Sequence, residues 1–484
     1  MSTLAKQLSM IRGTRPVKKI NEIMLSPIGI AIIGALTLFG FIFSLELVSY
    51  TIFILYAAYV AIFGNDFAPL MPIFMFAYVT PSTTNNPGKS EGGLFYGATG
   101  IYIIIIAAFA VTLIVLRLAL DKNMGFKKLF IKKRTFVISM LVLGASYLLS
   151  GIGSEKYLEY VKGNIIFALI QFASVFLLYF ILSATIDWES FKFDYFAAFA
   201  VILGIVVSLE VVWIYISEGV IQNGAIIRSK IYSGWGCYNN VGAVISISIP
   251  FAFHFACHKK NGFLYVLIAC LLLVGVVLSC SRGSMVGAAF AFAASFIYTF
   301  FKAENKKQYR ITSIAIIGAA LIAGIILHKQ IFALFNDVPA IMESTNGSVS
   351  FNDSSRFSLY KKGLGVYLDN PVFGQSFYPA AGTMPEFSDV EAFSSFFPPR
   401  WHNTVMQMLA ACGTVGMLAY SYHRIDTVIY YFKHRTANNT YVALSILTLL
   451  GMSLLDCHFF NLGPVLFYSM ALAVMEFGKE KPKA

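Results

Sequence analysis

Long apolar runs separated by short polar segments repeat along the whole chain and predict membrane-spanning helices. A span needs about 20 mainly apolar residues, and roughly 17 is a practical minimum. The third run is the weakest because it is short and contains Pro69 and Pro72, and the first two have an alternative arrangement as one bent hairpin. Fourteen runs satisfy or approach the required length, near residues 28–45, 47–63, 67–80, 94–117, 135–150, 165–183, 195–216, 241–257, 263–279, 284–301, 311–328, 404–422, 440–455 and 462–477.

Composition supports the same fold class. Hydrophobic residues make up 58% of the 484 positions and charged residues only 12%, against roughly 25% charged residues in soluble proteins. A soluble globular body is therefore excluded, and we expect an all-α polytopic membrane protein with about 14 (12–14) transmembrane helices. The six cysteines are scattered without a CxxC pair, so neither a disulfide framework nor a metal site is predicted.

The distribution of basic residues predicts the orientation of the spans. Short cytoplasmic loops are enriched in Lys and Arg. Placing residues 1–27 in the cytoplasm also places 25 of the 36 Lys and Arg residues there. Without the run at 67–80, the strongly basic segment 117–134 would lie outside, so we keep fourteen spans with both termini cytoplasmic. The formal net charge of +12 is then largely a topology signal, and no nucleic-acid partner is expected. The basic tail is expected to act as an uncleaved signal anchor.

One connection is much longer than the others. Residues 328–403 form a predicted external loop, whereas helix connections usually take only a few residues. Within it, the pattern from about Asp353 to Leu368 favours a helix that Asn352 or Asp353 caps and Asn370-Pro371 ends. A long loop of this kind is typical of a functional lid rather than a linker.

Two arginines on the predicted outer face are candidates for chemistry. Arg282 follows an apolar run in the turn Ser279–Ser284, where the orientation rule disfavours a basic residue. Its alternative role is to reach lipid phosphates at the membrane surface. Arg356 lies on the candidate loop helix, and its alternative is an ordinary solvated position. A guanidinium binds phosphate oxygens bidentately and keeps its charge, so two of them suit a diphosphate.

His402 is the candidate base. It lies just before the twelfth apolar run, where an imidazole with an ordinary pKa near 6.5 is mostly neutral and can accept a proton. Its alternative role is a structural histidine that binds the backbone. Arg400, Asn403 and Gln407 flank it as possible substrate-binding or supporting residues. With nucleotide sugars absent from the outer face, the expected donor there is a lipid diphosphate.

Other residues are weaker candidates for the same site on the predicted outer face. Asp456 and His458 are possible acceptor contacts or supporting residues, and two such side chains without a third make a metal site improbable. Tyr232, Trp235 and Trp401 are possible sugar-stacking residues, with an interfacial aromatic belt as their alternative. Glu210 lies within a span, where carboxylates are usually functional.

Several ordered motifs resemble the O-antigen ligase and polysaccharide polymerase superfamily. The resemblance covers roughly residues 230–420 and is carried by the order and spacing of the motifs rather than by any one of them. They are Gly234-Trp235-Gly236 with Asn239-Asn240, Ser281-Arg282-Gly283, Arg356 to Ser376 with Asn370-Pro371-Val372-Phe373-Gly374, and His402-Asn403-Thr404-Val405-Met406-Gln407 continuing to Cys412-Gly413-Thr414-Val415-Gly416.

The resemblance implies a membrane glycosyltransferase of the bacterial cytoplasmic membrane. Such an enzyme moves a glycan from undecaprenyl diphosphate to an acceptor hydroxyl on the outer face. It implies that Arg282 and Arg356 bind the diphosphate and that His402 is the base, with inversion at the anomeric carbon and neither a metal nor another cofactor. The acceptor is a glycan or a lipid-linked glycan, and the choice between repeat-unit polymerase and ligase stays open, with a slight preference for polymerase.

This reading divides the chain into four parts. Residues 1–27 are the tail, 28–216 the N-terminal helices, 217–422 the O-antigen ligase-like core with loop 328–403, and 423–484 the C-terminal helices and tail. The alternative function is a lipid-linked oligosaccharide flippase. Such transporters usually show two related halves and charges within their spans, whereas this chain has no visible repeat, few charges within its spans and one large external loop.

Overall fold

A computed structural model describes residues 10–79, 111–119, 134–154, 165, 168–169, 171–222, 225–233, 236–326, 353–376 and 401–478. The described part is mostly helical, as predicted. Its helices are α2 (Arg15–Met24), α3 (Pro27–Ile42), α4 (Glu46–Phe63), α5 (Leu70–Val79), α8 (Val137–Leu148), the π-helical turn η1 (Ala173–Leu177), α10 (Leu178–Thr185), α11 (Phe193–Ser217), η2 (Arg228–Lys230), α12 (Tyr238–His258), α13 (Gly262–Leu278), α14 (Arg282–Lys302), α15 (Lys306–Ile326), α17 (Asp353–Asp369), α19 (Thr404–Lys433), α20 (Ala437–Met452), η4 (His458–Phe460) and α21 (Leu462–Phe477).

Two small antiparallel hairpins interrupt the helices between α11 and α12. Strands β1 (Ile221–Gln222) and β2 (Ala225–Ile226) form the first, and β3 (Tyr232–Ser233) and β4 (Gly236–Cys237) form the second. The all-α prediction is therefore incomplete at this point. Hairpins this short could not be predicted from the sequence, because a strand of two residues shows no periodic hydrophobic pattern.

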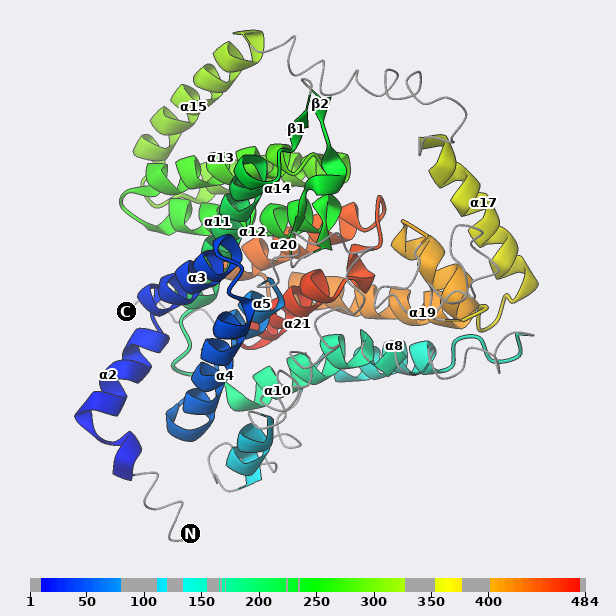
Figure 1. Ribbon diagram of the computed structural model, residues 1–484, viewed down its shortest axis with the longest axis horizontal. Coiled ribbons are helices and arrows are strands. Elements are labelled where there is room, and N and C mark those ends of the chain that lie inside the picture. The colour runs from blue at the N-terminus through cyan, green and yellow to red at the C-terminus, as the bar shows by residue number, and fades with distance from the viewer. Residues whose placement is uncertain are drawn as a thin grey trace.

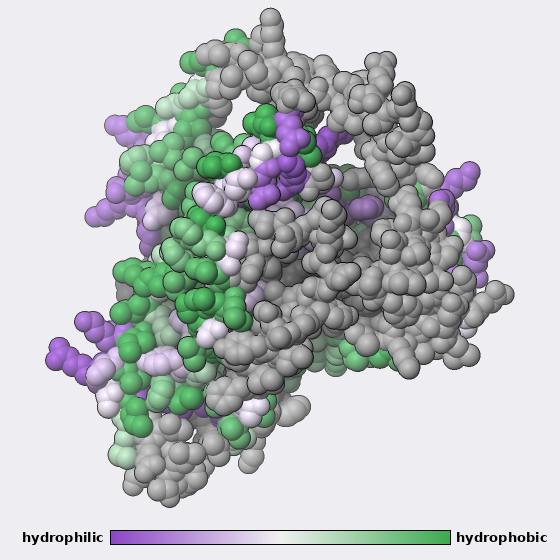
Figure 2. Space-filling model, viewed as in Figure 1, coloured by the Kyte–Doolittle hydropathy of each residue, from purple (hydrophilic) through white to green (hydrophobic). Residues whose placement is uncertain are grey.

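Helix α12 forms the centre of the bundle. It contacts α11, α13, α14 and α20, which surround it in Figure 1, and 94% of its most apolar window is buried. Where Figure 2 is coloured, green residues predominate on the left part of the face, and hydrophilic residues gather at its left edge and near the top centre. This distribution is that of a protein whose solvent is lipid.

Four described helices are long and apolar enough to cross a membrane, namely α11, α12, α14 and α19. A fifth span results if α2 and α3, which meet at an angle of 70°, are counted as one. Five further apolar helices have 10–17 residues in the described part. The fourteen-span count and the side on which each loop lies stay predictions.

Helix α19 is longer than the predicted run 404–422 and is broken in the middle. Gly413 has non-helical backbone angles (φ 64°, ψ −160°), which separate Thr404–Cys412 from Thr414–Lys433. The second half continues to Lys433 because buried His423 and Tyr430 face the bundle while apolar side chains face outward. The segment Arg424–Arg435 was predicted as a loop because its charges hide this helical periodicity.

The motif Asn370-Pro371-Val372-Phe373-Gly374 packs against the break in α19. Gln375 donates its backbone N–H to the Ala410 carbonyl, and Val415 donates to the Val372 carbonyl. Two glycines face each other here, and neither position has room for a side chain. A Cβ atom on Gly374 would lie 2.4 Å from the backbone of Ala411, and a Cβ atom on Gly413 would lie 2.4 Å from the carbonyl oxygen of Val372. The motif that follows α17 is therefore attached to α19 at the point where that helix bends.

Candidate active site

The N-terminal ends of four helices meet at one place and carry the candidate residues. Asn239 lies in the first turn of α12, Ser281 caps α14, His402 precedes α19, and Asn461 precedes α21. Helix N-termini bear a partial positive charge and unpaired backbone N–H groups. Their convergence creates a region that favours an anionic group.

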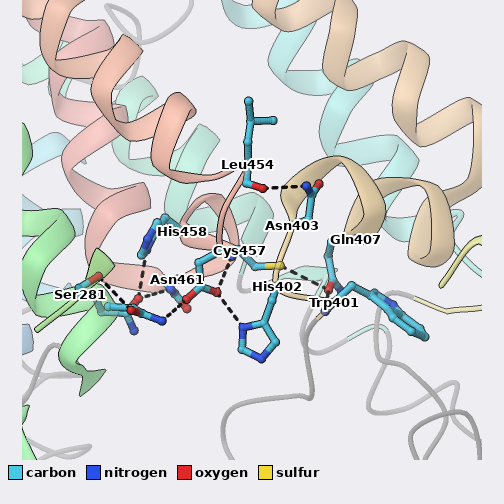
Figure 3. Close-up of polar contacts among 12 residues, drawn as sticks. Ser281, Trp401, His402, Asn403, Gln407, Leu454, Cys457, His458 and Asn461 are labelled. Carbon is cyan, nitrogen blue, oxygen red and sulfur yellow. Dashed lines mark hydrogen bonds and ion pairs between the residues drawn. The ribbon is translucent and has the colours of Figure 1, made fainter. Parts of the chain in front are cut away.

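Polar side chains connect these four helix ends (Figure 3). The Asn239 amide donates to the Asp456 carboxylate at 2.7 Å, and Ser281 Oγ donates to Asn239 Oδ1 at 2.9 Å. Asn240 Oδ1 accepts a hydrogen bond from the Asn461 amide and lies 3.3 Å from His458 Nδ1. Residues distant in the sequence are thus held in one hydrogen-bonded unit.

His402 and Asp456 form the central pair of this unit. His402 Nδ1 lies 3.2 Å from Asp456 Oδ1, with the imidazole side chain 44% exposed and the carboxylate 12% exposed. An ionised carboxylate can only accept a hydrogen bond, so the proton of a neutral His402 lies on Nδ1. The lone pair of Nε2 is then available to take a proton from a substrate.

The charge of Asp456 is strongly favoured. Burial alone would raise the pKa of this carboxyl, but the hydrogen bond from His402, the neighbouring imidazoles of His458 and His402, and the backbone N–H of Cys457 outweigh it and hold the pKa well below its usual range. The Cys457 N–H lies 2.7 Å from Asp456 Oδ1. Asp456 therefore stays ionised at neutral pH and fixes the tautomer of His402.

The backbone around His402 is held in an unusual conformation. His402 has a positive φ of 51°, which few residues other than glycine adopt. Asn403 follows as the N-cap of α19, accepting from the N–H groups of Val405 and Met406 and donating to the Leu454 carbonyl. Gln407 is buried and accepts the N–H of Trp401 at 3.0 Å. Asn403 and Gln407 thus support the turn that presents His402.

Arg282 is placed by the turn that precedes it. Ser281 accepts the N–H of Ser284 and so caps α14, of which Arg282 is the first residue. Cys280 has a φ of 57° and its Sγ lies 3.3 Å from the Tyr215 hydroxyl, which also donates to the Leu278 carbonyl. Arg282 is half-buried and adjoins Ser281, which contacts Asn239 and, through it, the Asp456–His402 pair.

The helix predicted at Asp353–Leu368 is confirmed as α17, and it packs against His402. The Tyr360 hydroxyl donates to the His402 carbonyl at 3.2 Å. Trp401 is 1% exposed in a cluster with Leu359 and Val366, so its ring packs inside the protein, whereas the sequence left it open between sugar stacking and an interfacial belt. Arg356 lies one turn before Tyr360 on α17, which places its backbone at the same end of the site.

Other predicted residues have different positions. Tyr232 lies in β3, half-buried and paired with Cys237, and His458 is buried behind Asp456. Glu210 is fully buried in α11, and neither of its oxygens has a hydrogen-bond partner among the described residues. Arg400 and Trp235 lie outside the described residues, as does the side chain of Arg356.

Three connections were not anticipated from the sequence. Ser281 was quoted only as part of a motif, Tyr360 was not singled out, and Asp456 was expected to be an acceptor contact or a supporting residue without a named partner. A serine immediately before a helix with a small residue three positions on is an N-cap signal, so the role of Ser281 was accessible. The contacts of Tyr360 and Asp456 join segments 42 and 54 residues apart, and no local pattern reveals them.

Comparison with known proteins identifies one family over part of the chain. A search of curated proteins finds no match. Residues 267–421 match the family described as O-antigen ligase, a range that includes Arg282, Arg356 and His402. Asn239 and Asp456 lie outside the matched range. Residues 267–421 therefore carry an O-antigen ligase domain, which supports the resemblance of the motifs to the O-antigen ligase and polysaccharide polymerase superfamily.

Proposed function

We propose that the protein transfers a glycan from an undecaprenyl diphosphate carrier to an acceptor sugar hydroxyl on the outer face of the bacterial cytoplasmic membrane. Glycan transfer of the ligase or polymerase type follows from the O-antigen ligase domain, and membrane residence from the apolar helices. The lipid-linked donor, the outer location and the roles of individual residues are the proposal itself.

The observation that carries the proposal is the His402–Asp456 pair within the network that begins beside Arg282. His402 Nε2 takes the proton of the acceptor hydroxyl while its oxygen attacks the anomeric carbon. The new bond joins that oxygen to the carbon, and the bond from the carbon to the diphosphate oxygen breaks. The electron pair leaves with the lipid diphosphate, and attack opposite the leaving group inverts the anomeric carbon.

Negative charge grows on the diphosphate as it leaves, and the site is suited to stabilise it. Arg282, Arg356 and the converging helix N-termini supply fixed positive charge, which a metal supplies in many other transferases. Fixed donors of this kind cost little reorganisation during the reaction. We therefore propose a metal-independent reaction, for which activity persists in excess EDTA.

The test replaces His402 with alanine and measures product length or ligated product in cells at matched protein levels. General-base catalysis contributes typically about 10²–10⁴-fold, so a loss of at least that order is expected. His434→Ala is the matched control, since His434 lies at the opposite end of α19 and contacts the Tyr430 carbonyl. Full activity of His402→Ala would disprove the assigned role.

The products also separate the remaining alternatives. After deletion of the gene, single-repeat products indicate a polymerase, whereas long unattached chains indicate a ligase. Vesicles that lack any acceptor test the flippase alternative: transport of a lipid-linked glycan there would contradict the transferase proposal.

A further inference from the structure

A buried arginine outside the catalytic network contacts the segment that carries Asp456. Arg424 lies on the second half of α19, and its guanidinium carbon is 4.1 Å from the ring centre of Phe459, 4.5 Å from Tyr420 and 4.7 Å from Tyr468. Its three guanidinium nitrogens are buried, and within the described part of the chain they interact with the hydroxyls of Tyr420 and Tyr468. Aromatic faces, rather than a carboxylate, stabilise this charge.

The aromatic group around Arg424 is itself polarised by a chain of hydrogen bonds. The Tyr468 hydroxyl lies 2.8 Å from His423 Nε2, and His423 Nδ1 lies 3.0 Å from Ser139 Oγ, which donates to Asp426 at 2.7 Å. Because Ser139 donates to the carboxylate, it accepts from His423 Nδ1, and Tyr468 donates to Nε2. A chain of hydrogen bonds thus connects Asp426 to Tyr468, whose ring faces Arg424.

Phe459 connects this group to the active site. It is fully buried in η4, three residues after Asp456 and directly after His458. Gln171, beside the π-helical turn η1, donates its side-chain N–H to the Phe459 carbonyl at 2.7 Å. Phe459 is therefore held through its backbone by Gln171 and through its ring by Arg424, while Asn240 contacts the flanking His458 and Asn461.

We infer that Arg424 is a positioning residue that holds the Asp456–His458 segment in register with His402 through Phe459. This inference rests on the proposed function. A charged residue within a membrane bundle is costly and usually functional, and the contact with Phe459 assigns that function to the segment that carries the partner of the base. Gln171 assists from the opposite element without contacting substrate.

The first readout does not depend on catalysis. Cys457 lies between Asp456 and His458 and is fully buried, and Cys412 on α19 is equally buried. Two single-cysteine proteins retain only one of these thiols, with the remaining cysteines replaced by alanine. We expect Arg424→Met and Phe459→Leu to raise the rate at which a small thiol reagent labels Cys457 by about tenfold, with Cys412 labelling unchanged. Arg310→Met is the matched control, since Arg310 lies over Phe300 at 5.1 Å away from the site.

The second readout is kinetic. Loosening Asp456 weakens stabilisation of the imidazolium form of His402, because a nearby carboxylate favours the charged base. We expect Arg424→Met to lower kcat about tenfold with little change in KM, and to move the acidic limb of the pH–rate profile to lower pH. The double variant Arg424→Met/Phe459→Leu should reduce kcat no more than the more damaging single substitution does, since both substitutions remove the same interaction.

Each outcome decides the inference. Equal gains in labelling at Cys457 and Cys412, or wild-type labelling at Cys457 in Arg424→Met, would show that Arg424 only supports general packing and would overturn it. An unchanged pH profile with reduced kcat would do the same. If His402→Ala retains activity, the proposed function fails, and the labelling experiment still decides whether Arg424 positions the segment.

Discussion

At the scale of single residues, the site depends on a histidine in a rare backbone conformation. His402 has φ 51° and is fixed from three directions, by the Tyr360 hydroxyl, the capping side chain of Asn403 and the Asp456 carboxylate. Strained conformations persist only where their surroundings enforce them, and they cluster at functional sites. The conformation therefore presents the imidazole at a defined angle to the helix ends.

Asp456→Asn tests the partnership directly. The asparagine keeps the size of the side chain but not its charge, so His402 loses the group that fixes its tautomer and stabilises its protonated form. We expect activity to fall by about 10²-fold or more, within the range of general-base contributions, measured as product per amount of folded protein. Asp369→Asn at the exposed end of α17 is the control and should act like wild type. Activity within a factor of two for Asp456→Asn would contradict the pairing.

Asp66 offers a separate pH-dependent test. It lies between α4 and α5, where burial raises its pKa to about 6, opposed by backbone N–H groups of Ala68 and Asp187. A folded pKa above the unfolded value means that stability declines as pH rises from about 4 through 6. Relative to Asp66→Asn, the free energy of unfolding of the wild type should fall by about 2 kcal/mol between pH 4.5 and 7. Unfolding in detergent at a series of pH values measures this difference. A difference that is flat with pH would refute the raised pKa.

At the scale of elements, the broken helix α19 links the external segment to the site. The backbone angles of Gly413 are essentially restricted to glycine, and the Val372 carbonyl occupies the space of a side chain. The break ends the short helix that begins at Thr404, directly after His402 and Asn403, and starts the longer one that carries Arg424. Gly413 therefore sets the relative direction of the two helices, the one that follows His402 and the one that carries Arg424.

Gly413→Ala should destabilise the protein by about 1–3 kcal/mol or more, the cost of a strained backbone conformation, and lower activity with it. Gly365→Ala on α17 is the matched control, because nothing lies within 4 Å of the added Cβ. There the change should be neutral or stabilising by up to about 1 kcal/mol. Equal melting temperatures for the two variants would contradict the role of the break.

The contrast between α17 and α19 shows what the sequence could reveal. The limits of α17 were predictable because a capping residue and an Asn-Pro stop lie within the segment itself. The break in α19 was not, since its cause is a motif some 40 residues earlier that docks against Gly413. His402, Arg282 and Arg356 were recognisable from their motifs, whereas the role of Asp456 depends on the packing of α20 against α12, which no local signal encodes.

At the scale of the whole molecule, contacts join loop ends that the basic residues assign to the same face. Gly151 donates to the Phe373 carbonyl, and the Ser154 hydroxyl donates to the Gln375 carbonyl, all on the predicted outer side. On the predicted inner side, the Glu476 side chain accepts the Thr135 N–H. These pairs agree with the predicted grouping of the loop ends on two faces, and which face is cytoplasmic stays a prediction.

Labelling of introduced cysteines tests that orientation. In a cysteine-free background, Lys361→Cys on α17 should react with a membrane-impermeant thiol reagent in intact cells. Arg435→Cys, at the far end of α19, should react only after permeabilisation. Both positions are exposed basic residues, so intrinsic accessibility is matched. The reverse pattern would invert the topology and place the site on the cytoplasmic side.

The attachment of the external segment also has an evolutionary consequence. Gln375 is bonded to Ala410, and Trp401 is bonded to Gln407, so residues 377–400 connect two fixed points about one helical turn apart on α19. Doubling the length of such a connection costs only about 0.6 kcal/mol in closure entropy. Insertions, deletions or wholesale exchange of this stretch can therefore accumulate without displacing His402.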